Sequence, residues 1–76
     1  MNALQPGMAG TSFAKWRAKM GWTQEQTARH LDVTLRTVQY WEAGKTSSGA
    51  ASAPPLTVRF AMAALVGDPK LKAWPE

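Results

Sequence analysis

Three side chains that can recognise nucleic-acid bases fall on one side of a short predicted helix, residues 35–43: Arg36, Gln39 and Tyr40. The opposite side of this helix is apolar and can pack against a core. An arginine guanidinium forks onto the O6/N7 edge of guanine, and a glutamine amide pairs with the N6/N7 edge of adenine. The spacing therefore predicts either a helix that reads DNA bases or a polar face that is only solvated.

The sequence holds few groups for other kinds of chemistry. It has one histidine, no cysteine and five scattered carboxylate side chains. These residues do not assemble readily into a catalytic triad, a carboxylate pair or a metal site, and no glycine-rich phosphate loop is present. We therefore expect no enzymatic activity, no catalytic residue, no metal, no cofactor and no small-molecule substrate.

The base-reading helix is predicted to be the second half of a helix-turn-helix over residues 23–44. Thr23 and Gln26 have the spacing of a capping box, which predicts a preceding helix over residues 24–31. The turn begins at Asp32, a residue type that reaches the left-handed backbone region at modest cost. A threonine then caps the second helix, and a glycine ends it.

A dense set of residues across this motif follows one known pattern: Thr23, Gln24, Glu25, Ala28, Leu31, Val33, Thr37, Val38, Trp41, Glu42 and Gly44. Through them, residues 13–44 resemble the Cro/CI (XRE) family of helix-turn-helix DNA-binding domains. The resemblance implies an all-α, five-helix, lambda-repressor-like fold whose second motif helix enters the major groove. One departure is Asp32, where the family usually has glycine.

The resemblance also implies which residues contact DNA. Gln24, Thr34 and Thr37 occupy positions that face backbone phosphates. Lys45 directly follows the base-reading helix, and we expect it to contact phosphate as well. Leu35 either touches a thymine methyl group or packs. The expected base-reading residues are Leu35, Arg36, Gln39 and Tyr40.

A further helix is expected before the motif, over about residues 12–20, with apolar residues at the spacing i, i+3, i+7. The resemblance implies that Arg17 of this helix forms a salt bridge with Glu42 of the base-reading helix. Residues 1–10 carry no charge and are expected to form a flexible N-terminal arm. Residues 11–76 would then form a single domain.

The second half of the chain is expected to contain a flexible connector from Ser47 onward, then helices over residues 55–66 and 69–74. The first of these helices has two apolar faces, whereas a surface helix of a small monomer needs one. We therefore expect a two-fold homodimer, although the C-terminal residues folding back over the second face is the alternative. The sequence leaves open which face is the interface. The expected interface residues are Val58, Ala61, Met62, Leu65 and Trp74.

Composition narrows the class of protein. A chain of 76 residues has room for one domain, and its 45% hydrophobic content favours folding over disorder. No apolar run approaches the ~20 residues of a membrane span, and the N-terminus lacks the regions of a signal peptide. The lack of cysteine fits a reducing cytoplasm, where we expect the protein. A net charge of +4 favours an anionic partner, with nucleic acid the first candidate.

A second, shorter resemblance covers residues 54–69. The run Pro-x-Thr-Val-x-Phe-Ala followed by Asp-Pro is similar to the C-terminal part of anti-CRISPR-associated proteins, which are helix-turn-helix repressors of phage operons. The two resemblances imply a repressor that binds double-stranded DNA with an inverted repeat and regulates its own operon. The alternatives are an antitoxin with the same DNA-binding fold, and an RNA-binding or protein-binding use of the motif.

Overall fold

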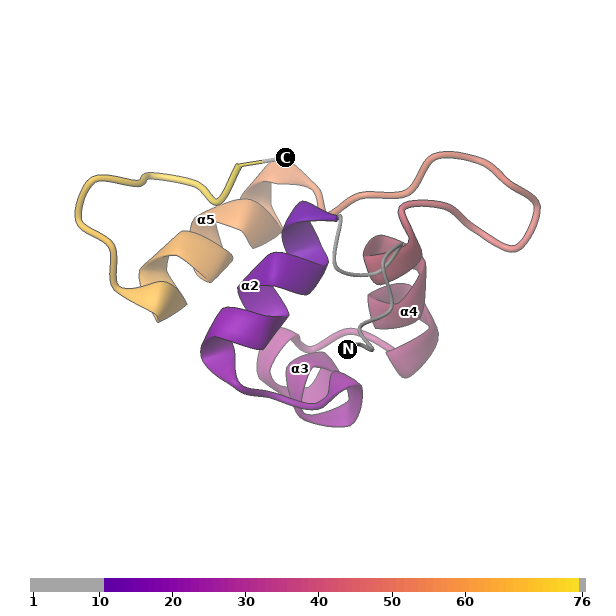
Figure 1. Ribbon diagram of the computed structural model, residues 1–76, viewed down its shortest axis with the longest axis horizontal. Helices are drawn as coiled ribbons and strands as arrows, with labels where there is room; N and C mark the ends of the chain where they lie inside the picture. The colour runs from indigo at the N-terminus through magenta and orange to yellow at the C-terminus, as the bar shows by residue number, and fades with distance from the viewer. Residues whose placement is uncertain (1–10, 76) are drawn as a thin grey trace, which may run out of the picture.

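The computed structural model describes residues 11–75, and four helices account for its regular secondary structure. Helix α3 packs against α4, and α2 packs against both α4 and α5 (Figure 1). The predicted N-terminal arm, residues 1–10, lies outside the described residues. The helices are α2 (Ser12–Met20), α3 (Gln24–Leu31), α4 (Leu35–Ala43) and α5 (Leu56–Val66).

Local capping explains why α2, α3 and α4 begin and end where the sequence predicts. Thr11, Thr23 and Thr34 precede these three helices, and each side-chain oxygen accepts a hydrogen bond from the backbone N–H three residues later. The predicted capping box is confirmed, because Gln26 Oε1 also accepts the Thr23 N–H at 2.9 Å. Each cap satisfies donors that the first turn of a helix leaves without partners.

The core forms where α2 meets α4 and α5. Trp16 is fully buried, and its indole Nε1 donates a hydrogen bond to the carbonyl oxygen of Met62 at 2.9 Å. The ring of Phe13 lies 5.7 Å from that of Trp16 and 5.4 Å from that of Trp41. Tilted and edge-on ring pairs at such distances stabilise beyond simple burial. This packing holds the inner face of α4 against α2.

The buried face of α5 includes residues that the sequence pattern assigns to a dimer interface. Val58, Met62 and Val66, spaced four residues apart, pack toward the core, and Met62 is 0% exposed. The expectation that Met62 lies at a dimer interface is therefore wrong, because its side chain is enclosed by its own chain. The helix is apolar nearly all round, so periodicity alone could not decide which stripe faces inward.

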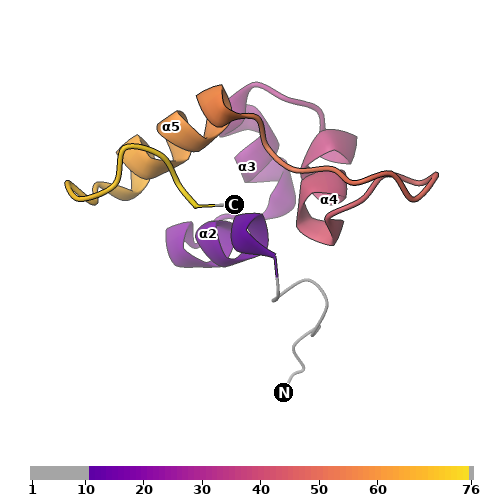
Figure 2. The ribbon, with the colours of Figure 1, turned by 90° about the horizontal axis from the view of Figure 1, so that it is seen from above.

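The C-terminal segment does not form the predicted fifth helix over residues 69–74. Asp68 caps a single turn, and the chain then runs back beside α5 toward the start of α2 (Figures 1 and 2). There Trp74 donates its backbone N–H to the carbonyl of Arg59 at 2.8 Å and its indole Nε1 to the carbonyl of Ser12 at 3.0 Å. A proline follows Trp74 and disfavours a helical backbone there. Trp74 is half-buried and packs against the core of its own chain.

Candidate nucleic-acid interface

The turn between α3 and α4 has the left-handed geometry predicted for Asp32. Its backbone lies at φ 58° and ψ 47°. The next residue, Val33, donates its N–H to the carbonyl of Ala28 at 3.0 Å and packs its side chain against the core. The turn is thus held by a backbone hydrogen bond to α3 and by the packing of Val33 on the core. Together these contacts fix the angle between α3 and α4.

The two faces of α4 differ in burial as the sequence predicts. Val38 and Trp41 are buried on the inner face, at 0% and 8% exposure. Arg36 and Gln39 are exposed, and Tyr40 is half-buried. Leu35 at the start of α4 is also half-buried. The helix therefore presents a guanidinium and an amide to solvent from a backbone that the core holds in place.

Tyr40 connects this outer face to the loop that follows α4. Its hydroxyl donates a hydrogen bond to Ser47 Oγ at 3.4 Å. The hydrogen bond with Ser47, and after it the charge of Arg36, hold the pKa of Tyr40 below its ordinary value of 10.0. Partial desolvation acts in the opposite direction but does not prevail. Arg36 and Tyr40, one helical turn apart, thus interact electrostatically on the outer face of α4.

The two threonines expected at phosphates share one hydrogen-bond relay. Thr34 Oγ1 accepts the backbone N–H of Thr37 at 3.1 Å and donates its own hydrogen to Thr37 Oγ1 at 2.9 Å. A hydroxyl group has one hydrogen to donate, so that of Thr34 is used within the chain. The hydroxyl hydrogen of Thr37 is the one that this relay leaves for an external acceptor.

The loop after α4 has a defined backbone. Lys45 and Ala51 form an isolated antiparallel bridge, and the N–H of Thr46 donates to the carbonyl of Ala50 at 2.8 Å. Gly49 permits the reversal with φ 91°. The connector expected from Ser47 onward therefore includes a hydrogen-bonded turn; its flexibility stays a prediction. Lys45 itself is exposed immediately after α4.

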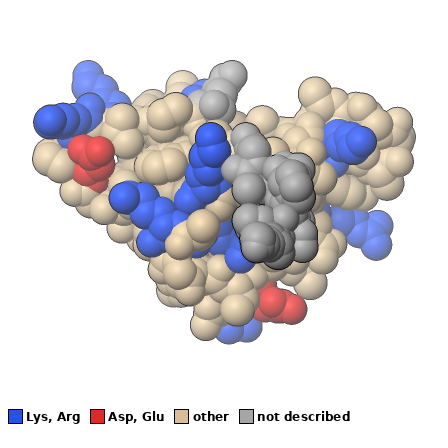
Figure 3. Space-filling view, viewed as in Figure 1, with Lys and Arg blue, Asp and Glu red and all other residues tan. Residues whose placement is uncertain are grey.

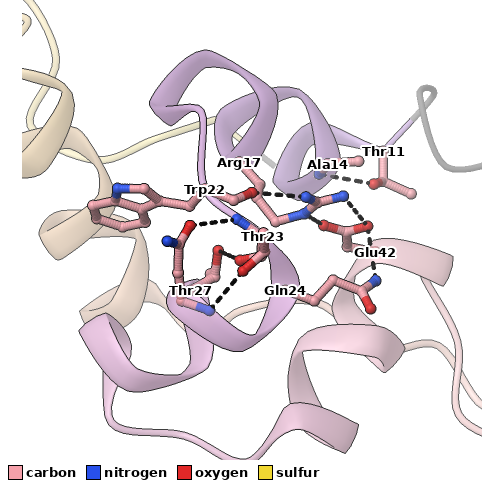
Figure 4. A network of polar contacts seen from close by, with 9 residues as sticks. Thr11, Ala14, Arg17, Trp22, Thr23, Gln24, Thr27 and Glu42 are labelled. Atoms are coloured by element: carbon pink, nitrogen blue, oxygen red, sulfur yellow. Dashed lines mark hydrogen bonds and ion pairs between the residues drawn. The ribbon is translucent and has the colours of Figure 1, made fainter.

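A buried polar network joins α2, α3 and α4 behind this surface (Figure 4). Glu42 is 1% exposed, and its carboxylate accepts hydrogen bonds from Arg17 Nε and, at 3.0 Å, from Arg17 Nη2. Arg17 Nη1 donates to the carbonyl of Trp22 at 2.8 Å. The predicted Arg17–Glu42 salt bridge is confirmed, and its acidic partner is fully buried.

Gln24 belongs to the same network. It is half-buried in the first turn of α3, and its Nε2 donates to Glu42 Oε1 at 3.3 Å. An amide nitrogen carries two hydrogens, so this bond leaves one for a phosphate. The sequence pattern pointed to Gln24 and Glu42 separately, but it did not predict this contact between them.

Basic side chains dominate the charged surface in the view of Figure 3. They gather in the centre, over α2, and on the loop after α4, while acidic side chains show at the left and lower edges. Lys15 and Lys19 are the exposed basic residues of α2, one turn apart. This distribution favours contact with an anionic polymer.

The outer face of α5 is apolar and unusually exposed for such large side chains. Leu56 is 50%, Phe60 46% and Leu65 45% exposed. Ala61 and Ala64 are exposed beside them. We call these five residues the outer α5 face. Of the residues expected at a dimer interface, Ala61 and Leu65 lie on it, whereas Val58 packs against the core.

Residues 11–75 contain no group of three or more histidine, cysteine, aspartate or glutamate side chains placed to hold a metal ion. No helix among them is long and apolar enough to cross a membrane.

Comparison with known protein families shows what the chain is similar to. A family model described as "Helix-turn-helix" matches residues 13–51, from α2 through the motif to the bridge that closes the following loop. This range includes every residue expected to contact DNA and ends before α5. No curated protein and no solved structure matches the chain.

Proposed function

Because the chain belongs to the Cro/CI-type (XRE) helix-turn-helix family, a family of DNA-binding regulator domains, we propose that it is a transcriptional repressor with a specific operator sequence. The observation that carries this proposal is the division of α4 into a buried apolar face and an outer face with Arg36 and Gln39 exposed. Repression follows if α4 occupies the major groove at a promoter and blocks access of RNA polymerase.

In this proposal, the outer face of α4 supplies sequence recognition. Arg36 donates two hydrogen bonds to a guanine edge, and Gln39 pairs with an adenine edge. Tyr40 and Leu35 contact bases beside them, Leu35 through a thymine methyl group. Arg36 and Tyr40 lie about one helical turn apart on α4, so in this proposal they contact neighbouring positions of the groove.

Contacts with backbone phosphates fix the register of α4 in the groove. Gln24 and Thr37 each have a hydrogen left to donate after their contacts within the chain. Thr34 supports Thr37 through the relay, and Lys45 adds a positive charge at the end of α4.

A homodimer paired through the outer α5 face would bind an inverted repeat. Half-sites about one helical turn (~34 Å) apart suit a two-fold helix-turn-helix dimer. The run of residues 54–69 that resembles anti-CRISPR-associated repressors supports an operon of a phage or mobile element as the target, with the protein regulating its own synthesis.

A binding titration tests the proposal. The DNA immediately upstream of the gene is compared with a shuffled duplex of equal length at two salt concentrations. Tighter binding to the upstream DNA, cooperative in protein concentration, is the expected result. Equal and strongly salt-dependent binding to both duplexes would mean that charge alone is responsible and would contradict autoregulation. Selection from a random duplex library would then show whether another operator exists, and co-purification of a toxin would favour an antitoxin.

A further inference from the structure

We propose that Glu42 is a positioning residue for DNA binding, whose buried carboxylate orients the Gln24 amide so that its second N–H meets a backbone phosphate. The inference rests on the proposed function, because it takes Gln24 as a phosphate contact. It assigns to the Arg17–Glu42 pair a role in recognition beyond joining α2 to α4.

The direction of the Gln24 side-chain amide decides whether it can bind a phosphate. A side-chain amide has a donor end and an acceptor end and can turn by 180° about its last bond. A carboxylate only accepts hydrogen bonds, so Glu42 binds the nitrogen end of the amide, as the 3.3 Å contact shows. The nitrogen keeps one N–H for a phosphate oxygen. Without the charge of Glu42, the amide is free to present its oxygen, which a phosphate repels.

A carboxylate near a phosphate would by itself oppose DNA binding. Here Arg17 compensates Glu42 with two hydrogen bonds, and the third contact of the guanidinium is to the carbonyl of Trp22. Glu42 therefore directs Gln24 from within a neutral pair. This arrangement lets an acidic residue serve a phosphate-binding side chain.

Glu42 belongs to the last turn of α4, the helix with the outer face of Arg36 and Gln39, whereas Gln24 lies in the first turn of α3. The hydrogen bond between them joins the phosphate contact directly to the base-reading helix. A displacement of Gln24 by the phosphate therefore displaces α4 as well. In this way Glu42 helps to fix the position of α4 along the duplex.

A phosphate scan separates this positioning role from a purely structural one. Operator duplexes are prepared with one neutral methylphosphonate at each position in turn, and the affinity of each protein variant is measured for the whole series. For the wild type, one position should lose about tenfold through Gln24, as expected for a hydrogen bond to a charged group. Gln24→Met, which has no donor, identifies this position by being insensitive there.

Glu42→Gln should lose sensitivity at that same position and keep it elsewhere. Val38→Ala is the matched control, because Val38 is fully buried in α4 and its side chain takes no part in the hydrogen bonds of Glu42. It should keep the wild-type pattern. Adding Gln24→Lys to Glu42→Gln should restore sensitivity at the position, because an ammonium donates in every orientation and no longer needs Glu42.

Wild-type sensitivity in Glu42→Gln would overturn the inference, as would operator binding in which no phosphate depends on Gln24. Neither result would affect the proposed function, which fails only if the wild type binds no specific duplex. Should Glu42→Gln not fold, nuclear magnetic resonance of the wild-type complex decides. A scalar coupling from the Gln24 side-chain nitrogen to the Glu42 carboxyl carbon is expected, and its absence would overturn the inference.

Discussion

Arg36 is proposed to contact a base, whereas Lys45 is proposed to contact a backbone phosphate, so their substitutions should have different effects. Arg36→Ala should cost ~1–3 kcal/mol of binding free energy on the operator and relax base preference at one position. Lys45→Ala should weaken binding to all sequences alike and reduce the slope of log affinity against log salt by about one. Titrations of both variants on operator and shuffled duplex measure the difference.

Each of these two variants serves as the control for the other. Both residues are exposed and basic, so they differ in position rather than in charge. Equal losses on operator and shuffled duplex for both variants would contradict the division of labour proposed for α4 and the loop.

Tyr40 predicts a pH dependence of DNA binding. Its pKa lies below 10.0 because of the hydrogen bond with Ser47 and the nearby Arg36 charge. As pH rises through this lowered pKa, the phenol becomes an anion on the face that meets DNA. Affinity should therefore fall on the alkaline side before lysine side chains lose their charge. Tyr40→Phe should remove this part of the loss, and titrations between pH 7 and 10 compare the two proteins.

Individual side-chain contacts differ in how far the sequence predicts them. The Arg17–Glu42 salt bridge could be predicted because a family pattern pairs those two positions. The contact of Gln24 with the same carboxylate could not, because it depends on the packing and rotamers of side chains from two helices. Likewise, the Tyr40–Ser47 bond depends on a loop backbone that closes through a bridge further along the chain.

Among the elements, α2, α3 and α4 could be predicted closely because their ends are set locally. A threonine cap acts on a backbone group three residues away, and Asp32 adopts its left-handed backbone within the turn itself. The segment over residues 69–74 depends instead on distant partners, chiefly the carbonyls of Ser12 and Arg59. The local sequence does not indicate these distant partners, so the prediction of a helix over residues 69–74 is wrong.

The link between α2 and α4 predicts an asymmetry between two substitutions. Arg17→Ala leaves the Glu42 carboxylate buried without its cation and should cost about 3–5 kcal/mol of unfolding free energy. Glu42→Ala leaves an arginine whose side chain is 22% exposed and can reach water, so it should cost less. Urea unfolding of both variants measures the order. Equal costs, or a larger cost for Glu42→Ala, would show that the carboxylate is not effectively desolvated.

The turn between α3 and α4 predicts a stabilising substitution. Asp32 holds φ 58°, which costs an L-residue roughly 1–2 kcal/mol in the unassisted case and an aspartate somewhat less. Asp32→Gly removes that cost, although glycine loses more entropy on folding. We expect a net gain of up to about 1 kcal/mol, seen as a higher melting temperature. Asp32→Val, with a branched side chain at the same φ, should destabilise instead.

At the scale of the whole fold, the large apolar side chains that residues 11–75 expose are concentrated on one helix. The aromatic core that joins α2, α4 and α5 uses the inner side of α5, and the C-terminal segment covers the junction with α2 through Trp74. Neither covers Leu56, Phe60 or Leu65, each close to half exposed. In a chain of 76 residues, with a correspondingly small core, burying this face against a second copy would add appreciable stability.

Phe60→Glu tests the dimer at this scale, because a charge at the centre of the outer α5 face would have to be buried against its own copy. The variant should sediment as a monomer where the wild type is a dimer. It should also lose about 10²–10⁴-fold in affinity for the inverted repeat, since one half-site no longer tethers the second. Affinity for a single half-site should be unchanged, because Phe60 is outside the motif.

Ala18→Glu is the control for charge, because it adds the same charge at an exposed position of α2; this variant should stay dimeric. A dimeric Phe60→Glu with full affinity for the repeat would exclude the outer α5 face as the interface and direct the search to another surface of the chain.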